Sequence, residues 1–264
     1  MSRAADRFLK VEKFLIILSA ISSFAIIAIL IPFFALFLCC RYDVVCKILG
    51  TQLLRNEFLN ALKNSLLAAT VATAILVFVS IPLGYVLARV DFRGKTVVES
   101  LVDLPLVVPH PIVGVMLLVA FGSRGIIPLG IEDTFWGIVS AMMFVAFPLA
   151  VDAVKLGFLS VDPMLEYVAR SLGASSFRTF LTISLPLCYR NILAGAILAF
   201  ARALSEVGSL LVLAPYPETV TVLIIKWFDT FGLPYAVAVS SLYLLLALAL
   251  FLALRALVKV GAYA

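Results

Sequence analysis

Long apolar runs separated by short polar stretches make up most of the chain. Six runs are long enough to cross a membrane, at about 14–38, 64–88, 98–121, 135–158, 190–214 and 236–257. A helix needs roughly 20 consecutive apolar residues to span the hydrocarbon layer. The pattern therefore predicts an all-α polytopic membrane protein with six transmembrane helices, and we interpret residues 1–264 as a single transmembrane domain.

The placement of lysine and arginine predicts how the chain is oriented. Both termini, the 89–96 loop and the 155–190 region together carry 13 of the 20 basic residues. Cytoplasmic loops of membrane proteins carry an excess of lysine and arginine. We therefore expect a multi-pass protein of the cell membrane with both termini in the cytoplasm. The 39–61 and 122–134 stretches are expected to be polar loops on the other side.

The third apolar run contains a break. Pro105, Pro109 and Pro111 fall within seven residues, which a regular helix does not tolerate. Broken backbone at membrane depth faces protein or a water-filled cavity rather than lipid. Asp103, Pro109 and His110 are therefore candidate pore residues. The alternative for His110 is a structural hydrogen bond to a carbonyl that the break leaves free.

The fifth run holds two opposite charges. Arg202 and Glu206 are four residues apart, so on a helix they share one face and can pair. Charged residues at membrane depth are costly and usually face the bundle interior. Ser205 and Gly208 beside them are small and allow another helix to approach closely. Two interpretations remain open: a gate, or an ion pair that only fixes helix packing.

The longest patterned segment between two apolar runs is residues 162–186, DPMLEYVARSLGASSFRTFLTISLP. Asp162 and Pro163 suit the start of a helix, and Gly173 suits its end. Ser175 or Ser176 can cap a second helical turn. An apolar stripe lies at helical spacing, and it consists of Leu165, Val168, Ala169 and Leu172. Taken alone, this pattern suits an amphipathic helix that lies on the bilayer surface. If the segment instead docks on a partner, as the resemblance described below implies, Glu166 and Arg170 are predicted as rim contacts.

Several classes of chemistry find no support in the sequence. There is no G-x-x-x-x-G-K-[ST] phosphate loop, no H-E-x-x-H and no G-x-S-x-G motif, and the chain has one histidine. Asp103 and Asp152 are weak grounds for an intramembrane hydrolase. The cysteines Cys39, Cys40, Cys46 and Cys188 form no C-x-x-C pair, which argues against a zinc site. Cys39 or Cys40 bridged to Cys46 is one possibility, and free thiols are the other. We predict no catalytic residue, metal or cofactor in this chain.

The 162–186 segment resembles the cytoplasmic loop of ABC importer permeases, which carries EAA, three residues, Gly, nine residues, then Ile-x-Leu-Pro. Gly173, followed by Ala174, lies at the spacing of that pattern from Ile183, Leu185 and Pro186. Its EAA positions are occupied here by Tyr167, Val168 and Ala169, with Glu166 one residue early. The stretch 64–89 resembles the first core span of these permeases. Two further stretches, 103–122 and 201–217, resemble the molybdate/tungstate branch, to which sulfate permeases are closely related.

The resemblance implies an assembly in which this chain has an ABC importer permease fold. Two copies would form a homodimer in the lipid bilayer, two ATP-binding subunits would dock on the 162–186 segment, and an extracytoplasmic binding protein would deliver a tetrahedral oxyanion. ATP and Mg²⁺ would bind to the partner subunits, and no nucleic acid is involved. Arg202 would then meet the anion transiently, with Glu206 preventing its capture. A sulfate or thiosulfate permease is the nearest alternative.

A different class is an ion-coupled secondary transporter. Such proteins repeat their broken helices in two halves of the chain. This sequence shows one broken segment, near residue 105, without a matching partner. The pattern therefore favours the importer permease.

Overall fold

The computed structural model describes residues 2–260, and for residues 2–14 and 257–260 it describes the backbone alone. Over this part of the chain the structure is helical and contains no strand. In chain order its elements are α1 (Ser2–Leu38), α2 (Tyr42–Gly50), α3 (Gln52–Arg89), α4 (Lys95–Val107), α5 (His110–Phe121), α6 (Phe135–Ser160), α7 (Pro163–Ser171), α8 (Ser176–Thr179), the π helix η1 (Phe180–Ser184), α9 (Leu185–Leu204), α10 (Leu210–Leu213), α11 (Val220–Phe231) and α12 (Leu233–Val260).

The number of predicted spans is confirmed. Five helical segments are long and apolar enough to cross a membrane, and they are Leu15–Leu38, Gln52–Arg89, Phe135–Ser160, Ser176–Leu204 and Leu233–Ala256. The helices α4 and α5 meet at a bend of 116°, and they make up the sixth span when this bent pair is counted as one. The chain is therefore a multi-pass helical membrane protein.

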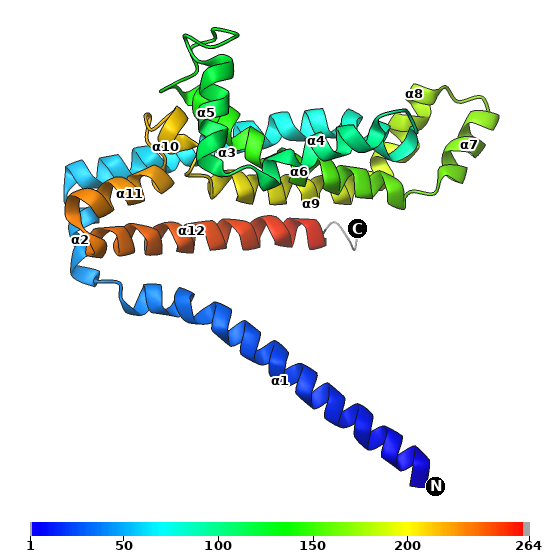
Figure 1. Ribbon diagram of the computed structural model, residues 1–264, viewed down its shortest axis with the longest axis horizontal. Helices are drawn as coiled ribbons and strands as arrows, with labels where there is room; N and C mark the ends of the chain where they lie inside the picture. Colours follow the sequence, from blue (N-terminus) through cyan, green and yellow to red (C-terminus); the bar gives the residue numbers. More distant parts are fainter. Residues whose placement is uncertain (1, 261–264) are drawn as a thin grey trace.

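The core of the bundle is formed by α3, α6 and α9, which lie side by side (Figure 1). Small side chains make the close approach possible, with Ala68 and Ala72 of α3 buried in one cluster with Ala141 of α6 and Ala203 of α9. In lipid, no strong hydrophobic force drives helices together. Small side chains let the helix backbones approach closely, and van der Waals packing then holds the helices together. Gly84 shows how close the helices are, since a Cβ there would lie 2.8 Å from Cγ1 of Val154.

The predicted break in the third span is confirmed, but it begins later than expected. Pro105 lies inside α4, whereas the helix stops at Val108, whose backbone is extended at φ −73° and ψ 125°. A residue that precedes proline is driven out of the helical region by the proline ring. Pro109 then precedes α5, and Pro111 sits in the first turn of α5, where a missing amide proton is harmless. Figure 1 shows α5 standing steeply off the bundle.

The 39–61 stretch is helical, so the prediction of a polar loop there is wrong. It contains α2 and the first turns of α3, with a break at Thr51. Val44 and Ile48 in α2, like Leu54 and Phe58 in α3, are buried four residues apart and pack against α11 and α12. The stretch is therefore amphipathic, and its helical period is hidden by the polar residues on the other face.

The predicted limits of the fifth span are also wrong. The helix begins at Ser176 and continues through η1 into α9, and it ends at Leu204 rather than near residue 214. Beyond Leu204, side chains replace helical hydrogen bonds. The hydroxyl of Tyr243 donates to the Leu204 carbonyl oxygen at 2.8 Å, and Ser209 N donates to the Glu206 carboxylate at 2.9 Å. Those bonds satisfy polar groups that an ending helix leaves unpaired.

Two further elements complete the fold. The stretch 215–235 contains the helix α11 (Val220–Phe231). The first helix α1 diverges from the bundle (Figure 1), and its apolar stretch from Leu15 to Leu38 is unburied. The four cysteines, all within the described residues, are free, so the free-thiol alternative holds in this structure.

Candidate functional site

The 162–186 segment folds as its capping residues predict. Asp162 Oδ1 accepts a hydrogen bond of 2.8 Å from Met164 N, at the start of α7. Gly173 has a φ of +92°, the left-handed conformation that glycine adopts without steric cost. Ser175 Oγ then accepts from Arg178 N at the start of α8. Figure 1 places α7 and α8 at the end of the bundle opposite α2 and α11.

The apolar stripe of this segment is exposed. Leu165 is 46% exposed, Val168 51% and Leu172 84%, while Ala169 is half-buried. The neighbouring Tyr167 is 60% exposed. An exposed apolar face of this kind can meet a protein partner or a bilayer surface. The structure therefore leaves this face of α7 free for a partner.

Glu166 does not lie at the rim of that face, so its predicted rim position is wrong. Only 2% of its surface is exposed. Its Oε1 accepts hydrogen bonds from Arg89 Nε and Ser184 Oγ, both at 2.9 Å. Its Oε2 accepts from the Tyr85 hydroxyl at 3.2 Å and is 3.5 Å from Arg170 Nη2. The Arg170 side chain, in contrast, is 42% exposed.

The surroundings of Glu166 keep its carboxylate ionised. Burial on its own raises the pKa of Glu166, but hydrogen bonds from Arg89 and Ser184, together with the charge of Arg89, outweigh it and lower the pKa. Because the pKa of Glu166 is lowered in the folded state, its ion pair contributes stability at pH values above the ordinary pKa of glutamate. This contribution is lost as the pH falls through the lowered value. The carboxylate is therefore a fixed charge at neutral pH.

The partners of Glu166 were not predicted. Arg89 is the last residue of α3, and Tyr85 lies one turn before it, 77 and 81 residues away from Glu166 in the sequence. The only signal for Arg89 is an arginine that closes a long apolar run. Because nothing in the sequence links it to residue 166, this contact appears only in the folded structure.

A second polar cluster lies where the break of the third span meets the end of α9. Arg202 Nη2 donates to Glu206 Oε2 at 3.1 Å, which confirms the predicted pairing. Glu206, however, lies beyond the end of α9 and not on the helix. The guanidinium of Arg202 also donates to His110 Nε2, and that nitrogen is 3.7 Å from Glu206 Oε2. The structure thus joins two candidate groups that the sequence treated separately.

The Glu206 carboxylate is the fixed centre of this cluster. It is 1% exposed, and its Oε1 accepts from both the amide and the hydroxyl of Ser209 at 2.9 Å. Arg202 and His110 remain partly exposed, with 23% and 45% of their side chains accessible. The buried carboxylate therefore holds the two basic groups from behind, and their outer faces stay available to a ligand.

An open cavity of about 450 Å³ lies in front of this cluster. Its lining residues are His110, Pro111, Arg202, Ser205, Glu206, Val207 and Gly208. Gly208 is needed for the close approach of the broken helix, because a Cβ there would lie 2.7 Å from the His110 Cβ. Arg202 Nη1 also donates to Ser205 Oγ at 3.2 Å. A guanidinium, an imidazole and a hydroxyl around one cavity suit recognition of an oxyanion.

Asp103 does not line this cavity. It lies on α4, where its carboxyl is close to that of Asp152 on α6. An ion pair of 2.6 Å between Lys155 and Glu99 lies on the same two helices. The two aspartates therefore do meet, but as part of the contact between α4 and α6, and apart from the cluster around Arg202.

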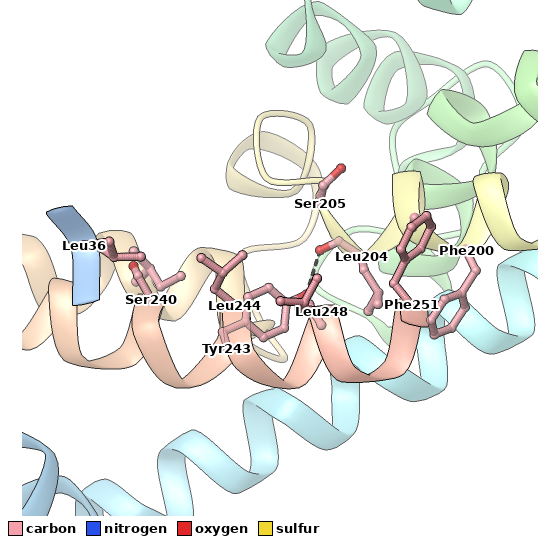
Figure 2. Close-up of a pocket in the computed structure, with 12 residues that line it drawn as sticks. Leu36, Phe200, Leu204, Ser205, Ser240, Tyr243, Leu244, Leu248 and Phe251 are labelled. Atoms are coloured by element: carbon pink, nitrogen blue, oxygen red, sulfur yellow. Dashed lines mark hydrogen bonds between the residues drawn. The ribbon is translucent and has the colours of Figure 1, made fainter. Parts of the chain in front are cut away.

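An apolar groove lies on the other side of Ser205. Its lining includes Leu36 of α1, Phe200 and Leu204 of α9, and Tyr243, Leu244 and Phe251 of α12 (Figure 2). Figure 2 shows the Tyr243 hydroxyl turned to the Leu204 carbonyl, which leaves the groove wall apolar. Ser205 lines both spaces. The end of α9 therefore separates a polar cavity from an apolar groove.

Comparison with known proteins agrees with this architecture. Residues 80–260 match the family described as the inner membrane component of binding-protein-dependent transport systems. A molybdate/tungstate transport system permease protein of Thermococcus kodakarensis is 44% identical over 92% of this chain and 96% of its own length. The corresponding protein of Methanocaldococcus jannaschii is 47% identical over 77% of this chain and 83% of its own.

Solved structures share the fold at low sequence identity. A bacterial ABC transporter involved in the import of the polysaccharide alginate covers 96% of this chain and 98% of its own, with a TM-score of 0.71 and 19% identity. At that identity the likeness concerns the fold alone. The match over residues 80–260 and the identities above show that this chain belongs to the family of binding-protein-dependent transport system inner membrane components, the permease subunits of ABC importers.

Proposed function

We propose that this chain is the permease subunit of an ABC importer that moves molybdate or tungstate into the cytoplasm. The observation that carries the proposal is the identity of 42–47%, over most of the chain, to relatives named as molybdate/tungstate permeases. The cavity beside Arg202 supports it, because its donor groups suit a tetrahedral oxyanion.

The proposed motor is a pair of ATP-binding subunits, which carry the ATP and Mg²⁺. Their docking site is the exposed face of α7, with Leu165, Val168 and Leu172 as its apolar centre and Arg170 at its rim. A second copy of this chain completes the pore, and an extracytoplasmic binding protein delivers the anion. The excess of basic residues on the termini and near α7 supports a cytoplasmic position for that end.

The proposed gate is the cluster of His110, Arg202 and Glu206. Arg202 offers a partly exposed guanidinium to the passing anion, while Glu206 lowers the net charge of the cluster and so prevents tight capture. His110 is the first residue of α5, directly after the break in the third span. The cluster therefore lies beside non-helical backbone, which at membrane depth faces protein or a water-filled cavity. Transport requires binding that is favourable but weak, which a partly neutralised arginine provides.

Uptake by the reconstituted complex tests the substrate. The chain is assembled in proteoliposomes with its ATP-binding subunit and binding protein, and accumulation of molybdate is measured with ATP inside. We expect accumulation that requires both ATP and the binding protein and that a large excess of sulfate leaves unchanged. Import of sulfate without import of molybdate would contradict the proposed substrate.

The docking of the motor on α7 is tested by Gly173→Val. A valine at a left-handed position is strained by about 1–2 kcal/mol, so the turn after α7 shifts. We expect less ATP-binding subunit to co-purify with this variant than with the unmodified chain. Gly50→Val is the matched control, because Gly50 is exposed, has no left-handed φ and lies at the other end of the bundle. If the unmodified chain, Gly173→Val and Gly50→Val all co-purify with the same amount of ATP-binding subunit, docking at this turn is ruled out.

The gate is tested by replacing both charges at once, Arg202→Gln with Glu206→Gln. The double change avoids leaving a lone buried charge, which would destabilise the fold by itself. If Arg202 contacts the anion, the assembled complex should import it roughly tenfold more slowly, as expected from the loss of one hydrogen bond to a charged group. Normal uptake, still coupled to ATP hydrolysis, would mean that the pair only fixes packing.

A further inference from the structure

The buried Glu166 carboxylate connects α7 directly to two other elements, and through Arg89 to a third. Arg89 and Tyr85 reach it from the end of α3, and Ser184 reaches it from η1, at the start of α9. Arg89 at the same time donates from Nη2 to the carbonyl oxygen of Val161, the residue that follows α6, at 2.8 Å. One side chain of α7 therefore ties that helix to the ends of the three core helices.

The π helix η1 is an independent sign that this contact is specific. It interrupts the long helix Ser176–Leu204 for five residues, Phe180–Ser184, and its last residue is the one that donates to Glu166. Such π segments are rare and occur mainly at functional sites. Ser184 is fully buried, and Phe180 packs edge-on against Tyr85 with 4.9 Å between ring centroids. The irregular turn thus presents a hydroxyl to Glu166 and a ring to Tyr85, one of the α3 partners of Glu166.

Outside this contact, α7 is held mainly by its own ends. Residues 161–162 precede it and residues 172–175 follow it, and its apolar stripe is exposed. A force applied to the exposed face reaches the core either through these short connections or through Glu166. The two connections are short turns whose backbone bonds run mainly to their own flanking residues, whereas the buried carboxylate accepts hydrogen bonds from α3 and η1 and has little freedom. The carboxylate contact is therefore the stiff route between α7 and the bundle.

We propose that Glu166 is a positioning residue that makes α7 move as one body with α3, α6 and α9 when the ATP-binding subunits change conformation. This inference rests on the proposed function as an ATP-driven importer. It places the link between motor and pore inside this chain, at the Glu166–Arg89 pair, and not only at the contact between subunits. Without it, α7 would still follow the motor but would move the core less.

The test is Glu166→Gln in the complete complex. Glutamine keeps the size and can still accept one hydrogen bond, but it lacks the charge that holds Arg89. The ratio of molybdate imported to ATP hydrolysed is measured in proteoliposomes, together with the stimulation of ATP hydrolysis by the binding protein. We expect the complex to assemble and to hydrolyse ATP, with the import ratio lowered roughly tenfold and the stimulation lost.

Glu99→Gln is the matched control. Glu99 lies at the same end of the bundle and pairs with Lys155, but both side chains are partly exposed. Removing such a pair has little effect, so the import ratio should stay at the value of the unmodified complex. A purely structural role for Glu166 would reduce the amount of assembled complex and lower import and hydrolysis in proportion, which leaves the ratio unchanged.

A milder change covers the case in which Glu166→Gln fails to assemble. Tyr85→Phe with Ser184→Ala removes two donors to the carboxylate and keeps the ion pair. It should lower the same ratio to a smaller extent. An unchanged ratio in the assembled variants would overturn the inference. If the unmodified complex is stimulated by its binding protein but imports no molybdate, the substrate proposal fails, and the stimulation still tests Glu166.

Discussion

Two buried carboxylates are the constraint on which the rest of this structure depends. Glu166 and Glu206 are 2% and 1% exposed in a protein built from apolar helices. A buried charge is tolerated only when it is paired and its oxygens receive hydrogen bonds. Each of the two meets an arginine and a serine, Arg89 with Ser184 in one case and Arg202 with Ser209 in the other.

The two carboxylates lie at opposite ends of α9. Ser184 immediately precedes α9 and binds Glu166, whereas Arg202 belongs to its last turn and binds Glu206. Between these points, α9 packs closely on α6, where a Cβ on Gly195 would lie 2.9 Å from Cβ of Ala153. A helix fixed at both ends by ionic contacts and along its length by close packing is suited to transmit displacement as a rigid body. The polar cavity at the break of the third span lies at one end of this helix and α7 at the other.

The sequence predicted the features that depend on local patterns. Long apolar runs gave the spans, Asp162 and Gly173 marked the ends of α7, and the prolines marked the break between α4 and α5, because each acts within a few residues. The stretch 39–61 was misassigned since its apolar residues are diluted by polar ones on the same helical turns. At the early end of α9, the Leu204 carbonyl accepts a hydrogen bond from Tyr243, which lies far along the chain.

The position of Glu166 was predicted incorrectly for a similar reason. As a charged residue between exposed apolar neighbours, it suited the rim of a docking face, and its partner Arg89 lies 77 residues earlier. Likewise, His110 and Arg202 were recognised separately, but their contact requires the 116° bend that brings the broken span to the end of α9. Pairings between distant residues follow from packing, which local pattern does not encode.

The link between the motor and the pore is tested most directly by measuring how accessible the cavity is to water in each nucleotide state of the ATP-binding subunits. A single cysteine replaces Ser205 in a chain whose four native cysteines have been substituted, and its reaction rate with a water-soluble thiol reagent is measured in the assembled complex. The account predicts a rate that differs between the nucleotide-free state and the state with a bound ATP analogue. With Glu166→Gln present, that difference should become much smaller. The same rate in both nucleotide states of the complex with Glu166 intact would contradict the account.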